Sequence, residues 1–233
     1  MDPANRLTPP PPARGGLVDD TDFARHTYVV IDFEGLTPAG RSPVPIEVAA
    51  LALTPKGDEL IETWRFEALI APPAEVPVTD FDIRQTGITP AMLADAAGPE
   101  QVMAELDALL SMPPYRLVAH HAPTEAGLIA HQAPHCRTLA ATPLLDTVRL
   151  ARITYPELSS HSLDALLRYL RIPPPHGRHR AMPDVEATAQ VLRRILCDGS
   201  ASGRWRALHE LDADGGLPPK RLLAGEGSQE ELF

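Results

Sequence analysis

The sequence predicts an α/β fold built on a mixed, five-stranded sheet that is flanked by helices. Its 233 residues are 44% apolar, which is enough for one sizeable hydrophobic core. Three apolar runs with strand character come first along the chain, and helical patterns then alternate with two further short runs. This order is typical of a single sheet whose first strands connect directly and whose later strands connect through helices.

The strands are expected where β-branched and other apolar residues are concentrated. The first run, YVVIDF, is typical of a buried strand. Gly57 supplies the turn between the second and third strands. The expected strands cover residues 28–33, 46–53, 59–70, 116–119 and 143–146.

The helices are expected from apolar residues at helical spacing and from their starting residues. Thr89 is a favoured N-cap, and Pro90 suits the first position of the helix that follows. The longest pattern, over residues 181–196, places Val185, Ala189 and Leu192 on one face. Further helices are expected over residues 100–110, 124–131 and 162–170, and in the segment that ends at Ile153.

Both ends of the chain are expected to lie outside the folded domain. Residues 1–24 are interpreted as a disordered leader, because the proline run Pro9–Pro12 favours extended polyproline and cannot pack. The domain itself is expected over residues 25–198. Residues 199–233 are polar and glycine-rich, and are interpreted as a C-terminal tail with a short helix near Trp205–Leu211.

Composition excludes several classes of protein. The chain carries 21 basic and 31 acidic side chains, a net charge of −10, which argues against a general nucleic-acid coat. It does not exclude an enzyme that reaches phosphates through metal ions. Cys136 and Cys197 are too few for a disulfide framework and have no zinc-site spacing. No apolar run approaches about 18 residues, so we expect no membrane segment and a cytoplasmic location.

A pair of acids ends the first expected strand. Asp32 and Glu34 are two residues apart, so their carboxylates project from the same face of that strand. Two such carboxylates repel each other, and a divalent cation such as Mg²⁺ or Mn²⁺ relieves that repulsion. Taken alone, the pair is more typical of a solvated strand end.

Further polar groups follow other elements. Asp184 lies in the first turn of the last long helix, His179 lies in the loop before it, and Glu125 lies in the first turn after the fourth strand. Each alone is typical of helix capping or of a solvated loop. A single sheet can bring all of them to one edge. Acids plus a histidine there match two-metal phosphodiester hydrolysis, in which the histidine accepts a proton from water.

The motifs together resemble those of a known family. They are VIDFEG at 30–35, IEVAA at 46–50, TGITPAML at 86–93, VAHHAPTE at 118–125 and HRAMPDVEAT at 179–188. In this order and spacing they resemble the DEDDh branch of the DnaQ-like 3′–5′ exonucleases, which includes the proofreading exonuclease of bacterial DNA polymerase III. The resemblance covers roughly residues 27–196.

The resemblance implies an RNase H-like fold and metal-dependent removal of nucleotides from a 3′ end. It implies two Mg²⁺ or Mn²⁺ ions held by Asp32, Glu34 and Asp184, with His179 as general base. Phe33 and Leu36 would line the pocket for the 3′-terminal nucleotide.

The second motif departs from the family. Glu125 stands where an Asp is usual, and its extra methylene leaves open whether it binds metal directly or through water. His121 replaces the usual Asn and either contacts a phosphate or packs. Leu36 and Thr37 stand where the family has paired threonines.

Charged residues near the motifs carry further expectations. Arg178 and Arg180 are expected at a basic rim for the substrate, or else as ordinary solvated charges. Asp146 and Asp164 are expected to have structural roles, with Asp146 a lesser candidate for the site. Glu47 is interpreted as a satisfied acid of the core.

The last five residues, QEELF, resemble the short motif with which bacterial proteins bind the replication sliding clamp. Gln229, Leu232 and Phe233 would make that contact. A five-residue match also arises by chance, so the alternative is a tail without this role.

These observations favour a 3′–5′ exonuclease that acts on single-stranded 3′ ends of DNA in proofreading or repair. An exoribonuclease of the RNase T or oligoribonuclease type is the alternative within the enzymes, because discrimination of the sugar depends on packing around its 2′ position. A catalytically inactive binding module is the alternative outside them.

Overall fold

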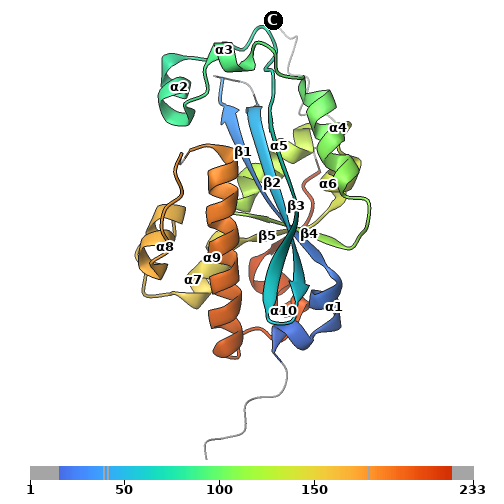
Figure 1. The fold of residues 1–233 in the computed structure, drawn as a ribbon, viewed down its shortest axis with the longest axis vertical. Helices are drawn as coiled ribbons and strands as arrows, with labels where there is room; N and C mark the ends of the chain where they lie inside the picture. Colours follow the sequence, from blue (N-terminus) through green and yellow to red (C-terminus); the bar gives the residue numbers. More distant parts are fainter. Residues whose placement is uncertain (1–15, 39, 41, 178, 222–233) are drawn as a thin grey trace, which may run out of the picture.

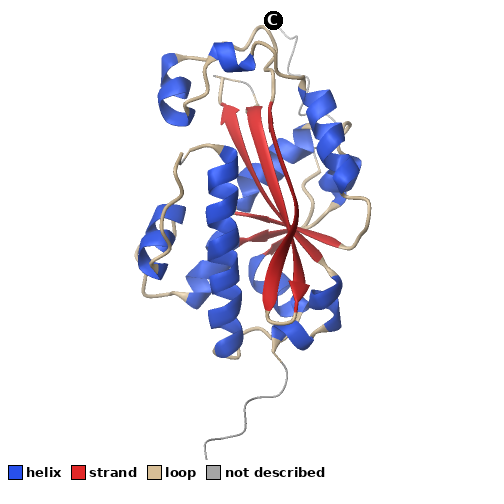
Figure 2. Cartoon of the chain, viewed as in Figure 1, coloured by secondary structure: helices blue, strands red, loops and turns tan. Residues whose placement is uncertain are grey.

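The computed structural model describes residues 16–38, 40, 42–177 and 179–221, and its centre is one twisted sheet (Figures 1 and 2). The sheet has six strands in the order β3-β2-β1-β4-β5-β6. The strands are β1 (Thr27–Leu36), β2 (Val44–Lys56), β3 (Glu59–Leu69), β4 (Tyr115–Ala119), β5 (Leu144–Asp146) and β6 (Gly216–Leu217).

Strand directions are mixed, as predicted. β2 pairs antiparallel with β1 and β3, whereas β4 runs parallel to both β1 and β5. The first three strands are thus a meander and the next two follow helical crossovers. The predicted count of five strands is one short, because Gly216 and Leu217 add the antiparallel edge strand β6 beside β5.

Helices cover both faces of this sheet. They are η1 (Leu17–Asp19), α1 (Thr21–Arg25), α2 (Asp80–Thr86), α3 (Pro90–Leu93), α4 (Pro99–Leu109), α5 (Ala122–His131), α6 (Arg137–Ala141), α7 (Thr147–Thr154), α8 (Leu163–Leu170), α9 (Ala181–Ala201) and α10 (Leu208–Gly215). None of the helices in the described part of the chain has the length and apolarity needed to span a membrane.

The two faces of β1 belong to two different cores. Tyr28 and Val30 pack into the cluster that contains α7, α8 and α9, whereas Val29, Ile31 and Phe33 pack into the cluster that contains α4, α5 and α6. This alternation follows from the two-residue period of a strand. Asp32 and Glu34 continue the series of Tyr28 and Val30, so they leave β1 on the face that α9 covers.

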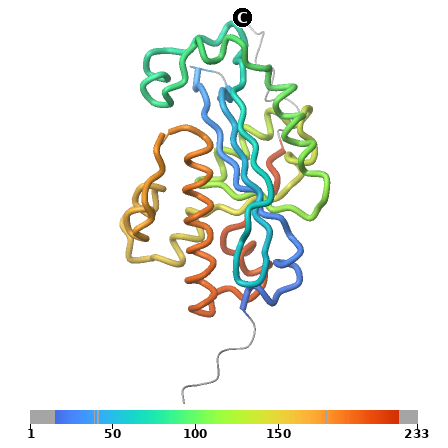
Figure 3. The backbone as a smooth tube through the Cα atoms, viewed as in Figure 1, coloured from blue at the N-terminus to red at the C-terminus, as the bar shows by residue number. Residues whose placement is uncertain are grey.

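The long helix α9 lies against β1 and β2, and Figure 3 shows its N-terminal end beside that pair of strands. Its apolar stripe, which includes Val185, Leu192 and Ile195, is fully buried in the first core. The helix continues to Ala201, five residues beyond the expected 196.

The predicted domain ends do not match the structure. Leu17 and Phe23, placed in the disordered leader, lie in short helices and are each 2% exposed in the core. Trp205, placed in the tail, is fully buried, and its Nε1 donates to Asp214 Oδ2 at 2.8 Å. The domain therefore includes residues 16–24 and extends at least to Leu217, while residues 1–15 lie outside the described part.

Candidate active site

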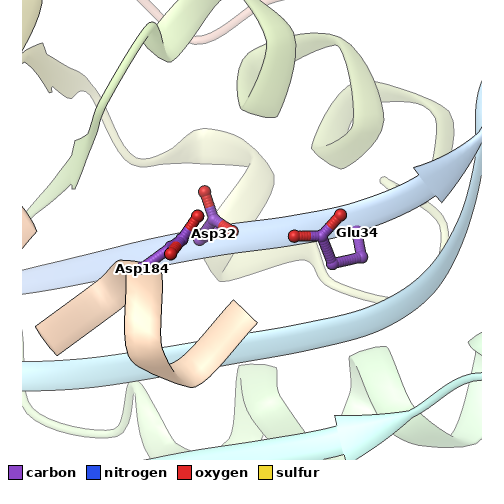
Figure 4. Close-up of side chains that lie close together, drawn as sticks. All are labelled: Asp32, Glu34 and Asp184. Atoms are coloured by element: carbon purple, nitrogen blue, oxygen red, sulfur yellow. The ribbon is translucent and has the colours of Figure 1, made fainter. Parts of the chain in front are cut away.

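Three carboxylates meet on the α9 side of β1. Asp32 and Glu34 come from the carboxyl-terminal half of β1, and Asp184 comes from the first turn of α9. Each offers a carboxylate oxygen within 4.8 Å of those of the other two, and Figure 4 shows Asp184 reaching from α9 toward the strand. The structure therefore brings together residues that are up to 152 positions apart in the sequence.

This donor set suits a hard divalent cation. Like charges this close destabilise one another, and carboxylate oxygens are the ligands that Mg²⁺ and Mn²⁺ prefer. Among the described residues, the group that meets the geometric condition for holding a metal consists of Asp32, Glu34 and Asp184. The three residues thus fit the divalent metal that the sequence predicts.

Local structure explains why these side chains converge. The β1–β2 register pairs Asp32 with Ala49 and Glu34 with Glu47, and it shifts by a bulge after Glu34. Bulges bend a strand and re-aim its side chains, and they are frequent beside active sites. Asp184 sits where the positive end of the α9 dipole stabilises a carboxylate.

Glu125 is not one of the three residues of this cluster. It is 5% exposed in the first turn of α5, and its Oε2 has no hydrogen-bond partner among the described residues. Burial raises the pKa of its carboxyl group to about 8; its own backbone N–H lowers it, and the charges of Asp146 and Glu34 raise it further. Within the described residues, burial and the two neighbouring acids therefore outweigh the stabilisation that the backbone N–H gives to the ionised form of Glu125.

Asp146 has the structural role expected for it. It ends β5 and caps α7, with Oδ1 accepting from the Val148 N–H at 2.8 Å. Its Oδ2 lies 3.9 Å from Arg149 Nε. In addition to burial, the negative charge of Asp146 raises the pKa of the nearby Glu125 carboxyl group.

Two histidines of the motifs adopt left-handed backbone conformations. His179 is exposed with φ 67°, immediately before the N-cap of α9, and His121 is exposed with φ 73° at the N-cap of α5. Such conformations cost a non-glycine residue of the order of 1–3 kcal/mol and cluster at functional sites. The Nδ1 of His121 lies 3.0 Å from Thr124 Oγ1. The general-base role of His179 stays a prediction.

The residues expected in a substrate pocket are mostly enclosed by the protein. Phe33 is 8% exposed and packs on the face of the sheet opposite the carboxylates. Leu36 is 2% exposed in a small cluster with Ile46 and Ile88. Their contact with a nucleotide stays a prediction.

Arg180 is held by the protein itself. Its guanidinium donates to both carboxylate oxygens of Glu47, which is fully buried in β2. Glu47 is thus the satisfied core acid that the sequence predicts. Arg178 and the clamp-like residues Gln229, Leu232 and Phe233 lie outside the described residues, so their roles stay predictions.

Sequence reasoning missed the polar group at the ends of β4 and β5. His120 Nδ1 lies 2.9 Å from Thr147 Oγ1, which in turn donates to the Ala119 carbonyl. His120 directly precedes His121 in the second motif, and its position at a strand end is the signal that could have found it.

The mixed sheet, with Asp32 and Glu34 on β1 and Asp184 on α9, has the fold and the acidic cluster expected of an RNase H-like exonuclease. The family model described as "Exonuclease" matches residues 29–192, and the chain belongs to this family. This confirms the resemblance drawn from the motifs.

Comparisons with individual proteins agree. The chain is 34% identical over 179 residues to the PolC-type DNA polymerase III of Bacillus cereus, a match that spans 76% of this chain and 12% of that protein.

Two solved structures share its fold. The nuclease domain of 3′hExo, a DEDDh family member bound to rAMP, matches with a TM-score of 0.66 and 20% identity, over 78% of this chain and 96% of that one. Exonuclease X in complex with 5′ overhanging duplex DNA matches with a TM-score of 0.59 and 24% identity, over 81% and 99%.

Proposed function

We propose that this chain is a divalent-metal-dependent exonuclease that removes nucleotides from single-stranded 3′ ends, with DNA as the favoured substrate. The observation that carries the proposal is the convergence of Asp32, Glu34 and Asp184, whose carboxylate oxygens lie within 4.8 Å of one another in a chain of the exonuclease family. The family supports hydrolysis of nucleic acid, and the three carboxylates could hold the metal ions that this reaction needs.

Each group of the site has a defined task in this proposal. Asp32, Glu34 and Asp184 would hold two Mg²⁺ or Mn²⁺ ions, and the buried carboxylate of Glu125, whose pKa is raised by burial and in part by the charge of Glu34, would add negative charge near them. When bound, the ions supply activation of water and stabilisation of the leaving oxygen. His179 stands exposed just before α9 and would accept the proton of the attacking water at its imidazole.

The choice of DNA rests on the relatives. The PolC-type match is a DNA polymerase, which supports a role in proofreading or repair. The 3′hExo nuclease domain binds rAMP, which keeps an exoribonuclease of the RNase T or oligoribonuclease type as the second candidate.

The experiment follows cleavage of matched single-stranded DNA and RNA, labelled at the 5′ end, with Mg²⁺, Mn²⁺ or EDTA. We expect a metal-dependent ladder that shortens from the 3′ end, faster on DNA. Asp32→Asn and Asp184→Asn should each lose about 10³-fold or more in rate, because removing a ligand removes several kcal/mol of transition-state stabilisation. Asp58→Asn, at the exposed β2–β3 turn, is the matched control.

The outcomes separate the candidates. A faster RNA ladder would replace DNA by RNA as the substrate. Substantial turnover by both Asn variants would refute the assignment of the metal ligands. A folded wild-type protein that cleaves neither substrate would instead favour the inactive binding module.

A further inference from the structure

The contact between Glu47 and Arg180 links β2 to the start of α9. The Nε of Arg180 donates to Glu47 Oε1 at 3.0 Å and to Oε2 at 2.9 Å, and its Nη2 also donates to Oε1. The backbone N–H of Ala181, the first residue of α9, donates to Glu47 Oε2 at 2.9 Å. One carboxylate therefore holds both a side chain and the helix terminus.

This ion pair lies in a protected environment. The side chain of Glu47 is 1% exposed and that of Arg180 is 30% exposed. Removing such charges from water costs free energy, and an apolar pair of similar size is often at least as stable. Overall stability alone is therefore a weak reason for charged residues at these two positions.

The position of the pair points to another reason. Arg180 directly follows His179, and its carbonyl accepts from the Asp184 N–H at 3.2 Å. Anchoring Arg180 thus restrains the backbone at His179, the expected general base, and at Asp184, the expected metal ligand.

The same pair also borders the carboxylate cluster. Glu47 is the cross-strand partner of Glu34, so both side chains leave the sheet on the α9 face. The hydrogen bond to Glu47 raises the pKa of the Arg180 guanidinium, burial lowers it, and the charges of Glu47, Glu67 and Glu34 raise it further. Arg180 therefore compensates the negative charge of Glu47, which would otherwise add to the negative charge of Asp32, Glu34 and Asp184.

We propose that Glu47 and Arg180 are positioning residues of the nuclease reaction, whose ion pair fixes His179 and Asp184 relative to Asp32 and Glu34. The inference rests on the proposed function. It gives Arg180 a task other than the substrate contact expected from the sequence, and it gives Glu47 a task in the reaction.

The test compares Glu47→Gln and Arg180→Ala with the wild type in steady-state cleavage of single-stranded DNA with Mg²⁺. Each should lower kcat by about 10- to 100-fold and change KM by less than about threefold, because misplaced catalytic groups slow the chemical step. Arg180→Lys should restore part of kcat, since lysine keeps the charge but not the two-pronged hydrogen-bonding geometry.

A second ion pair provides the matched control. Arg65 of β3 lies 3.1 Å from Glu186 of α9, so it also links the sheet to this helix, but both side chains are 40–50% exposed. Arg65→Ala and Glu186→Gln should leave kcat unchanged. A loss in these variants equal to that in Glu47→Gln would overturn the proposal, because any link to α9 would then suffice.

The double variant Glu47→Leu/Arg180→Met guards against unfolding, because an apolar pair can replace a buried ion pair without loss of stability. It should fold, and its kcat should fall no further than that of either single variant, since both remove the same interaction. A double variant with the wild-type kcat would overturn the positioning role.

Three other outcomes would also overturn it. If Arg180→Ala raises KM without changing kcat, and Glu47→Gln changes neither KM nor kcat, Arg180 is a substrate contact. If the wild type does not cleave at all, the proposed function fails, and the positioning role fails with it. A wild type that cleaves, beside variants that cleave equally fast, overturns only the positioning role.

Discussion

Glu47 and Glu125 are two buried glutamates near Glu34, and their hydrogen-bonding surroundings differ. Glu47 is fully buried and receives hydrogen bonds from Arg180 and from the Ala181 N–H. Glu125 is 5% exposed, and its Oε2 receives no hydrogen bond from the residues that the structure describes. Its neighbours include the negative charges of Asp146 and Glu34, which, with burial, raise its pKa to about 8.

The different surroundings suit different roles: Glu47 is paired with Arg180, whereas Glu125 would be ionised next to a bound cation. A buried carboxylate needs a compensating charge or it becomes protonated. Arg180 supplies that charge to Glu47 within the protein. For Glu125, a divalent ion at the cluster of Asp32, Glu34 and Asp184 would supply it under the proposed function. Two similarly buried glutamates would then have different tasks.

Removing the anchor should have the largest effect on stability. Glu47→Ala leaves the Arg180 guanidinium and the Ala181 N–H without their acceptor, and losing one partner of a buried pair costs about 3–5 kcal/mol. Because Arg180 is 30% exposed, water offsets part of this, and we expect a loss of about 2–4 kcal/mol in the free energy of unfolding. Urea denaturation in EDTA measures it.

The control for that prediction is Glu59→Ala, at an exposed glutamate of β3. It should change the free energy of unfolding by less than about 0.5 kcal/mol. Similar losses in the two variants would mean that Glu47 contributes no more than a surface acid.

Replacing Glu125, the other buried glutamate, should increase the free energy of unfolding rather than decrease it. The pKa of Glu125 is raised from 4.5 to about 8, so the folded state binds its proton more tightly than the unfolded state does. The contribution of the protonated group is complete below about pH 4.5 and is lost as the pH rises to about 8. Glu125→Gln, which does not ionise, avoids this loss and should be more stable at pH 8 by on the order of 2–4 kcal/mol in EDTA.

Thermal or urea unfolding at several pH values measures this difference. The difference between the wild type and Glu125→Gln should be constant below about pH 4.5 and should grow between about pH 4.5 and pH 8. A constant difference over that range would show that the carboxyl group of Glu125 is ionised with a pKa near its ordinary value, and the comparison with Glu47 would lose its basis.

The comparison also shows what the sequence could and could not predict. The strands were predicted nearly in place because period-two alternation and β-branched residues are local signals, as in β1. Strand β6 was missed because Gly216 and Leu217 form a strand only through pairing with β5. Helix α2 was missed, although the capping box of Thr79 and Asp82 is a local signal for it.

The predicted domain ends failed for a related reason. Leu17, Phe23 and Trp205 lie in short segments that are rich in polar residues and glycine, and each is buried only because distant elements cover it. Trp205, for example, packs so closely on α9 that a Cβ on Gly199 would lie 2.2 Å from its ring. Such burial depends on tertiary contacts, which composition does not reveal.

The site was predicted to the extent that the motifs define it. Asp32, Glu34 and Asp184 were assigned as metal ligands from motifs that resemble those of the exonuclease family, and the structure brings them together. The partnership of Glu47 with Arg180 spans 133 residues and crosses from β2 to α9, so no local pattern indicates it. Burial of Glu125 likewise depends on how α5 packs beside β5.

The smallest expected effect comes from shortening Glu125. Glu125→Asp keeps the charge, removes one methylene and restores the residue that the family usually has there. Losing a buried methylene costs about 1 kcal/mol of stability, and we expect cleavage of single-stranded DNA to change by less than about tenfold. The rate constant at saturating substrate, with Mg²⁺ and with Mn²⁺, measures it.

The same change at Glu47 makes this result informative. Glu47→Asp withdraws the carboxylate from Arg180 and Ala181, so it should reduce kcat more than Glu125→Asp does. If Glu125→Asp instead reduces the rate by more than about 10²-fold while Glu47→Asp does not, the reach of Glu125 is what the reaction requires. The site would then be built around a glutamate that binds the metal directly, and Glu47 would be no more than a structural acid.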